Sequence, residues 1–360
     1  MHALVRASSV HSVVRVTGNF ASENPLHPAA REALLAAFDQ GWADPKKLSQ
    51  SSARAAILRN QALENIASHL GLPVTSLEIL GEPSLGHYLS IAGLFNGSSA
   101  FAYSAVDKGK IRAIARSHSH EVIQLPVNQS GAILDCASIP DDAVLSLQLA
   151  NAETGIIQSE FDSIPQSVRI AIDATASGSR IPLPVRWNTA LFDASSWNGP
   201  SGLAIMAVKN SAEFSYPLPH IAPIRTPGSY SLPLLIASSI ALENFRDIDS
   251  SLRAFALAEF GHIDGIRSVA PEALALPHLF SVVAEGVTGE HVVRELAAQG
   301  IDIDSGSACS PEDLQPSHVL AAMGYPTSGH LRFTLRNGVT REEISTLVSA
   351  VSAVVQKLRG

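Results

Sequence analysis

The stretch Val168-Arg-Ile-Ala-Ile-Asp173 decides the fold that we expect for this chain. Its residues are mostly apolar, and an aspartate ends the run. A short apolar run that does not alternate with polar residues is typical of a strand covered on both faces. The stretch therefore predicts a buried strand that ends at Asp173.

Four further apolar runs of this kind lie before and after it, separated by helical or turn-rich segments. These runs are Val122–Val127, Val144–Leu149, Leu191–Ala194 and Leu203–Val208. Strands that alternate with helices favour an α/β fold with a mostly parallel sheet.

The character of the sequence changes near Tyr216, where a proline-rich linker begins. Beyond it we predict a helix from Pro233 to about Phe245, followed by strands over His278–Ala284 and Leu331–Leu335. Thr340-Arg-Glu-Glu343 predicts a capping box at the start of a long amphipathic helix. The chain from about residue 216 is thus expected to form a second, α+β domain.

The composition of the chain bears on its binding partners and on its cellular compartment. The 360 residues carry a net charge of −8, which gives no electrostatic footprint for DNA, RNA or anionic lipid. The two cysteines suggest a reducing compartment. There is no signal-peptide pattern in the first 20 residues and no apolar run of about 18 residues. We expect a soluble cytoplasmic protein without nucleic-acid or membrane partners, and we predict no metal site.

The stretch Ser305-Gly-Ser-Ala-Cys309-Ser310 contains the best candidate for a nucleophilic side chain, the thiol of Cys309. Small residues around Cys309 leave its thiol accessible, and Ser310-Pro311 reads as an N-cap followed by the first helical residue. The positive potential before a helix N-terminus favours the thiolate, which is the nucleophilic form. The alternative is that Cys309 is a small buried hydrophobic residue.

Several short stretches, taken in order, resemble the cysteine desulfurases, a family of pyridoxal-phosphate (PLP) enzymes with the class V aminotransferase fold, fold type I. They are Pro25-Leu-His-Pro28, Asn151-Ala-Glu-Thr-Gly155, Ile172-Asp-Ala174, Asn198-Gly-Pro-Ser-Gly202, Ser305–Ser310, Pro316–Gly324 and Leu331-Arg332. The resemblance implies a large PLP-transferase domain over residues 20–215 and a small domain built from residues 1–19 with 216–360. It also implies a homodimer with active sites at the interface.

The resemblance assigns a role to each matching residue. Cys309 matches the nucleophile that takes sulfur from L-cysteine as a persulfide and releases alanine. Arg332 matches the clamp for the substrate carboxylate, and Asp173 the acid that pairs with the pyridinium nitrogen. Asn151 matches the residue beside the phenolic oxygen of PLP, and Arg225-Thr-Pro-Gly228 the segment that reaches into the partner subunit. Alternatively, Asp173 is a strand-end N-cap and Arg332 an ordinary ion-pair partner.

The chain departs from the family at the residue that binds PLP covalently. The family has a lysine at the end of a Ser-x-His-Lys run shortly before Gly-Pro. Aligning Gly199-Pro200 without a gap puts Ser195 and Ser196 at the histidine and lysine positions. A serine has no amine and cannot form a Schiff base or act as the lysine base.

Other departures also face the cofactor. The family binds the PLP phosphate with a Gly-Thr pair at a helix N-terminus, where this chain has Glu82-Pro83-Ser84. Ser84 keeps a hydroxyl, but Pro83 has no N–H and Glu82 adds like charge. Lys108 stands at the position of the ring-stacking histidine, and Ala176 at that of a glutamine that assists Asp173. PLP is therefore expected from the family, while the pocket predicts that it is not held as a working cofactor.

Three functions remain open on the sequence. The first is a desulfurase-like pseudoenzyme, a homodimer or a heterodimer with an active paralogue, in which Cys309 relays sulfur toward an acceptor protein. The second is an active PLP-dependent cysteine desulfurase that uses a non-standard amine. The third is a structural or regulatory partner of an active paralogue, in which Cys309 is inert.

Overall fold

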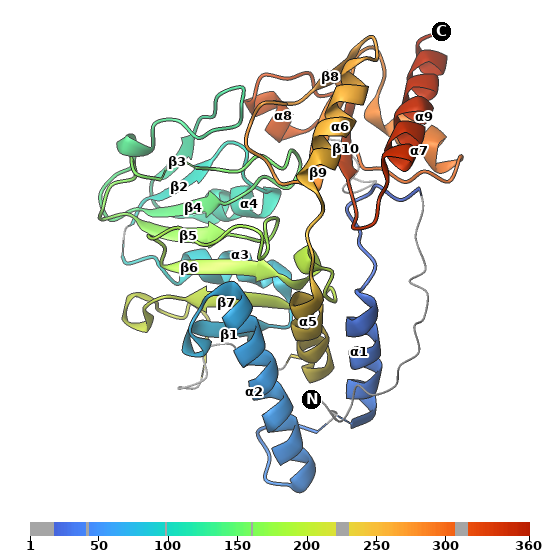
Figure 1. Cartoon of the computed structure of the whole chain (residues 1–360). Coiled ribbons are helices and arrows are strands. Elements are labelled where there is room, and N and C mark those ends of the chain that lie inside the picture. The colour runs from blue at the N-terminus through green and yellow to red at the C-terminus, as the bar shows by residue number, and fades with distance from the viewer. Residues whose placement is uncertain (1–17, 41–42, 98, 160, 221–229, 307–315) are drawn as a thin grey trace.

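The five predicted apolar runs form strands of a seven-stranded sheet (Figure 1). The computed structural model describes residues 18–40, 43–97, 99–159, 161–220, 230–306 and 316–360. The strand order is β1-β7-β6-β5-β4-β2-β3; the strands from β6 to β3 run parallel, and β7 is antiparallel to both its neighbours. The mostly parallel α/β sheet expected from the sequence is confirmed. Its strands are β1 Leu77–Leu80, β2 Phe101–Ser104, β3 Val122–Leu125, β4 Val144–Gln148, β5 Arg169–Asp173, β6 Thr189–Asp193 and β7 Ala204–Val208.

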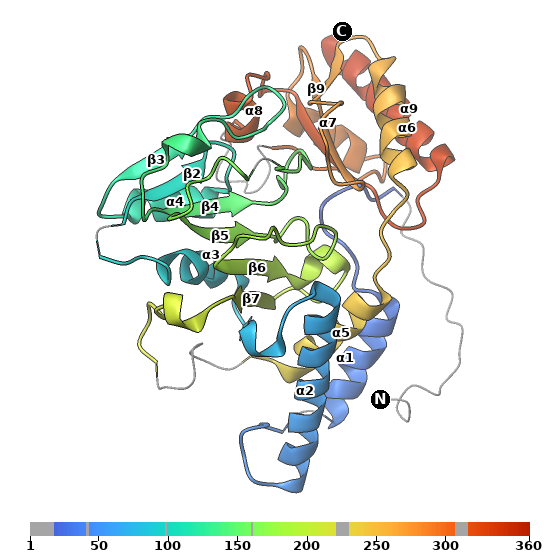
Figure 2. The same ribbon diagram turned by 60° about the vertical axis from the view of Figure 1, so that its left-hand side comes forward.

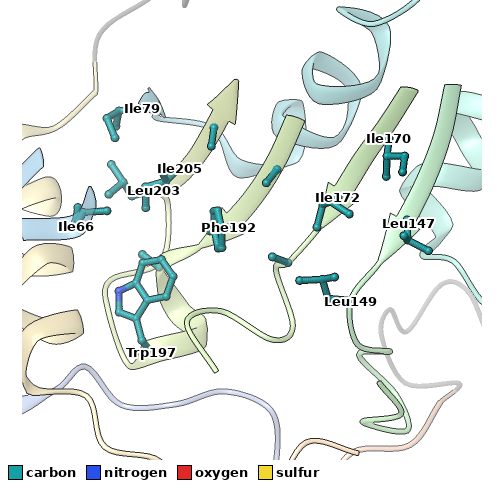
Figure 3. Packing of buried hydrophobic residues seen from close by; sticks show 14 of the residues in the cluster. Ile66, Ile79, Leu147, Leu149, Ile170, Ile172, Phe192, Trp197, Leu203 and Ile205 are labelled. Atoms are coloured by element: carbon teal, nitrogen blue, oxygen red, sulfur yellow. The ribbon is translucent and has the colours of Figure 1, made fainter. Parts of the chain in front are cut away.

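Side chains along β5 alternate between two apolar cores, so the strand is buried on both faces. Ile170 and Ile172 belong to the core that also contains Ile66, whereas Ala171 packs with Ile91 on the other face. Figure 3 shows the first core, where Trp197 lies near Ile66 and Phe192. Three helices contribute to this core, and two cover the opposite face. They are α1 Pro28–Gln40, α2 Gln50–Leu70 and α5 Leu232–Asn244, and α3 Pro83–Ala92 and α4 Gly109–Ser117.

A second, smaller unit contains an antiparallel sheet in the order β10-β9-β8. The predicted capping box of its last helix is present, with Thr340 and Glu343 capping each other. Phe20, from the other end of the chain, is buried in this core, and its N–H donates to Asp302 O (2.7 Å). The elements are β8 Ile266–Ser268, β9 Leu279–Ala284, β10 His330–Thr334, α6 Ser250–Gly261, α7 Gly289–Ala297, α8 His318–Ala322 and α9 Arg341–Arg359.

The position of α5 bears on the expected domain division. This helix lies after residue 216, yet Leu235, Ala237 and Ala241 pack into the core of the large sheet. Figures 1 and 2 agree in placing α5 beside α1 and away from the small sheet. We therefore propose that the small domain begins after Asn244 rather than at residue 216, and that its N-terminal contribution includes Phe20.

Short 3₁₀ turns complete the described chain, and one of them, η3, carries Ser196. Within the described ranges, no helix combines the length and the apolar character needed to cross a bilayer. The turns are η1 Val74–Ser76, η2 Cys136–Ser138, η3 Ala194–Trp197 and η4 Ser211–Glu213.

Candidate functional site

The large sheet brings two predicted cofactor residues to one edge. Asp173 is the last residue of β5, and its register partners are Gln148 on β4 and Leu191 on β6. Asn151 follows the end of β4 by three residues. In open α/β sheets, ligands bind in the crevice outside the carboxyl ends of the strands. Asp173 and Asn151 therefore lie at the edge where a ligand site is expected.

The carboxylate of Asp173 is buried and already bound by neighbouring side chains. Its Oδ2 lies 3.2 Å from Lys108 Nζ and 3.2 Å from His87 Nε2. Its Oδ1 accepts hydrogen bonds from the backbone N–H (2.9 Å) and the hydroxyl of Thr175, and Lys108 Nζ donates to that hydroxyl. Burial alone would raise the pKa of Asp173, but Lys108 and then His87 hold that pKa well below its ordinary value. The carboxylate is thus ionised at neutral pH and is paired with a lysine of its own chain.

Asp107 is a second buried carboxyl at this edge, in the turn that follows β2. Its Oδ2 accepts a hydrogen bond from Ser104 N–H (2.9 Å). Burial, reinforced by the negative charge of Asp173, raises the pKa of Asp107 to about 8, despite the opposing effects of the Ser104 N–H and Lys108. Asp107 therefore keeps its proton at pH 7, and Asp173 is the carboxylate that Lys108 neutralises.

The N-terminus of α3 is capped by a carboxylate of its own chain. Glu82 is the N-cap residue, and its Oε1 accepts hydrogen bonds from the backbone N–H (2.9 Å) and the hydroxyl of Ser84. These hydrogen bonds lower the pKa of Glu82, so the exposed side chain stays negative. Ser84, the predicted phosphate ligand, therefore directs both donors to Glu82.

Asn151 is buried, and both ends of its amide have partners. Its Oδ1 accepts from the N–H groups of Glu153 (2.9 Å) and Thr154 (3.0 Å), and its Nδ2 donates to Val106 O (3.0 Å). These contacts close the turn after β4 and join it to the end of β2. In this arrangement Asn151 stabilises the backbone of the site.

Ser196, the residue at the family's lysine position, directs its hydroxyl to its own turn. Its Oγ donates to Asp193 O (2.7 Å), and its carbonyl accepts from Arg180 Nη1 (2.6 Å). A Cβ added to Gly178 would lie 2.3 Å from Ser196 Oγ, so Ser196 packs directly on the turn that follows Asp173. The next residue, Trp197, is fully buried and donates Nε1–H to Ser238 O (3.2 Å).

Arg332 comes from β10 and links the small domain to the site. Its Nη2 forms an ion pair with Asp304 Oδ2 (2.9 Å) and a hydrogen bond with Ser22 Oγ (3.2 Å). Its Nη1 donates to Ala152 O (3.4 Å), in the same turn as Asn151. The predicted carboxylate clamp is therefore next to the predicted cofactor residues, and a carboxylate of its own chain is bound to it.

Cys309 and Gly228 lie outside the described residues, as do the rest of 221–229 and 307–315. The residues on either side of 307–315 are close to each other: a Cβ on Gly306 would lie 2.9 Å from Ser317 Cβ and 2.1 Å from His330 Nδ1. Ser317 Oγ donates to Glu153 Oε2 (2.6 Å), two residues after Asn151. Burial lowers the pKa of His330 to about 3, so this imidazole is neutral. One flank of the Cys309 segment thus contacts the turn that holds Asn151, and the other flank packs against the first.

The structure brings together Asp173, Asn151 and Arg332, while Ser84 and Ser196 face their own turns. Sequence reasoning did not predict that Lys108 and Asp304 would bind Asp173 and Arg332. Lys108 stands 65 residues before Asp173, and no short motif connects residues at such a separation. The only signal in the sequence was that a cation replaced the expected histidine at position 108. The described residues contain no group of three or more His, Cys, Asp or Glu side chains that could hold a metal ion.

Comparisons with known proteins give matches that are consistent with one another. The family model described as Aminotransferase class-V matches residues 225–347. The cysteine desulfurase IscS of Dictyoglomus turgidum is 24% identical over 378 residues, covering 95% of this chain and 94% of that protein. The cysteine desulfurase IscS of Methanosarcina thermophila is 26% identical over 374 residues, covering 93% of this chain and 90% of that protein.

Solved structures share the fold over nearly the whole chain. A NifS-like protein superposes with a TM-score of 0.83 at 17% identity, covering 95% of this chain and all (100%) of the other. A NifS-like protein from Rickettsia africae gives a TM-score of 0.81 at 17% identity, covering 94% and 99% of the two chains. The order of the site residues along the chain, the α/β fold and relatives that match over most of their length agree: the chain is similar to the cysteine desulfurases and has the class V aminotransferase fold.

Proposed function

We propose that this protein is a member of the cysteine desulfurase family that does not use PLP as a working cofactor and that relays sulfur on Cys309. The observation that carries the first part is the buried ion pair between Lys108 Nζ and Asp173 Oδ2, 3.2 Å apart. To pair with the pyridinium nitrogen of PLP, the carboxylate must not be bound by other groups of the protein. Here the chain's own ammonium group and His87 already bind that acid.

The residues present do not fit PLP at two further points. A phosphate requires N–H donors and no like charge, but Glu82 places a carboxylate at the N-terminus of α3 and takes both donors of Ser84. An aldehyde requires an amine, and Ser196 offers a hydroxyl that is bonded to Asp193 O. We therefore derive no reaction step through PLP.

The second part of the proposal rests on the sequence around Cys309. The Cys309 thiolate attacks the outer sulfur of a donor persulfide, a new S–S bond forms on Cys309, the S–S bond of the donor breaks, and the donor leaves as a thiolate. The transferred sulfur keeps its oxidation state, so no external oxidant is needed. An acceptor thiol then takes the sulfur by the same exchange. The protein would act in the cytoplasm, as a homodimer or beside an active paralogue that supplies the sulfur.

The cofactor part is tested by titrating the purified protein with PLP and then adding L-cysteine. We expect no protein-bound absorbance band at about 390–420 nm, where a bound Schiff base absorbs, and no release of alanine. A band accompanied by alanine release would contradict the proposal.

The relay part is tested with a low-molecular-weight persulfide that carries labelled outer sulfur. Wild-type protein should take up one label per chain, and Cys309→Ala should take up none. Cys136→Ala is the matched control, since Cys136 is buried and its removal should not affect uptake. Equal labelling of wild type and Cys309→Ala would contradict the relay and favour a structural or regulatory partner in which Cys309 is inert.

One observation favours the second candidate, an active desulfurase with a non-standard amine. Lys108 places a primary amine beside Asp173 and Thr175, inside the site. If PLP gives a visible band, Lys108→Ala should abolish it, whereas Lys110→Ala should not, because Lys110 is exposed in the first turn of α4, the helix that follows Lys108. That result would establish Lys108 as the anchoring amine.

A further inference from the structure

Polar side chains from both domains form a connected cluster where residues 307–315 leave and rejoin the described chain. One comes from the turn after β4 and three come from the small domain; they are Glu153, Ser281, Ser317 and His330. We propose that this anchor cluster consists of positioning residues, which hold the ends of segment 307–315 beside the turn and so place Cys309 for sulfur exchange. The inference deepens the relay part of the proposed function and does not involve PLP.

Glu153 joins the two domains through both its side chain and its backbone. Ser317 Oγ donates to Glu153 Oε2 (2.6 Å), and Ser281 Oγ donates to Glu153 O (2.6 Å). Ser317 lies two residues after the segment and also caps α8, since its Oγ accepts from Leu320 N–H (3.2 Å). The carboxyl end of the segment is therefore fixed to the turn that holds Asn151.

The hydrogen bonds of Ser281 determine which ring nitrogen of His330 carries the proton. The single hydroxyl proton of Ser281 is used on Glu153 O, so the hydroxyl oxygen accepts from His330 Nε2–H (2.9 Å). His330 Nδ1 therefore carries no proton; it is buried and has no hydrogen-bond partner in the described part of the chain. Burial, and then the charge of Arg332, lower the pKa of His330 to about 3. The ring is thus neutral at pH 7 and is not a base for a thiol.

The amino end of the segment packs against the same ring. A Cβ on Gly306 would lie 2.1 Å from His330 Nδ1 and 2.9 Å from Ser317 Cβ, so a side chain at this position would displace its neighbours. Ser305, the residue before it, is also buried. Cys309 is three residues beyond Gly306, so the chain allows at most about 11 Å between their Cα atoms. Holding Gly306 in place therefore restricts where the thiol can act.

Disulfide trapping measures whether Cys309 is held beside the turn. The parent protein for this test carries Ala152→Cys and Cys136→Ala, which leaves thiols at positions 152 and 309. We expect diamide to link them within one chain, because fixing the ends of a segment raises the effective concentration of a group on it. Glu153→Ala removes the acceptor of Ser317 and should slow the cross-link roughly fivefold to tenfold. Glu153→Gln keeps a side-chain oxygen as acceptor and should restore most of the rate.

The controls separate the anchor cluster from effects on thiol ionisation. Glu153→Ala and Glu153→Gln both remove the negative charge, so a difference between them reports the hydrogen bond to Ser317. Glu121→Ala, at an exposed position, should leave the rate unchanged. A parent protein that forms no cross-link, or equal rates for the two Glu153 variants, would overturn the inference. Normal trapping without uptake of labelled sulfur would instead contradict the relay, so the two failures can be told apart.

A double-mutant cycle covers the case in which Glu153→Ala does not fold. Gly306→Ala places a methyl group against His330 Nδ1 and should slow the cross-link in the same parent. His330→Ala removes the ring, so adding Gly306→Ala to it should have a clearly smaller effect, as expected for two residues in contact. Equal effects of Gly306→Ala with and without the ring would overturn the inference, because the end of the segment would not be packed against His330.

Discussion

Asp173→Asn is expected to destabilise the protein by about 3 kcal/mol at neutral pH. Removing one partner of a buried ion pair costs about 3–5 kcal/mol. We take the lower end because the Lys108 side chain is 26% exposed and can turn toward water. His87 would lose an acceptor for its Nε2 as well, and its Nδ1 is buried without a hydrogen-bond partner within the described structure. Urea unfolding of the two proteins at pH 7 measures the difference.

The pH dependence identifies the charge as the cause. The folded-state pKa of Asp173 is depressed, so its contribution is fully present above the unfolded-state value of about 3.9 and is lost as the pH falls through the lower folded-state pKa. The difference between wild type and Asp173→Asn should therefore be constant near neutrality and shrink below about pH 4. Asp162→Asn, at an exposed position, should show no difference. A constant difference down to the lowest pH at which both proteins fold would rule out the ionised pair.

Trp197→Ala is expected to destabilise the protein by about 3–5 kcal/mol, as large aromatic truncations in cores do. The indole is fully buried and packs against the sheet in the core that contains Ile66 and Phe192 (Figure 3). The substitution also leaves Ser238 O without the indole donor. Denaturant unfolding monitored by circular dichroism gives the free energy directly.

Trp187→Ala serves as the matched aromatic control. Trp187 is only partly buried and lies under the ammonium group of Lys209, with Nζ 5.4 Å from the ring centroid. Its removal should cost clearly less than that of Trp197. Equal losses would contradict the expectation that the cost follows the burial of the indole.

The continuity of the apolar runs made most of the large sheet predictable, because a strand buried on both faces has few polar residues. Two strands were missed. β1 and β2 have four residues each, and β1 begins with the half-buried Leu77 and Glu78 at an edge of the sheet. The capping box at Thr340 was predictable because both partners lie within four residues. The packing of α5 was not, since its contacts with α1 and α2 are made across most of the large domain.

The candidate site was predictable only in part. Asp173 and Asn151 follow apolar runs, so their places at the strand ends could be predicted from local sequence. The partners of Asp173 and Arg332 could not, since His87 is 86 residues before Asp173 and Ser22 is 310 residues before Arg332. Such contacts depend on the order of the strands in the sheet, which short sequence patterns do not predict. The predictions for Cys309 and Gly228 stay predictions, because both residues lie outside the described chain.

The insertion of Phe20 into the small domain limits how this protein can be divided into fragments. Phe20 lies at the edge of the small sheet, where its carbonyl accepts from Thr334 N–H (2.7 Å), and its ring completes an apolar core made otherwise of residues after 245. A gene segment that encodes only the last third of the chain would therefore yield a domain with one core residue missing and one strand edge uncovered. In the proposed division, segments on both sides of the large domain build the small domain, so a fragment that keeps its whole core must also include the large domain between them.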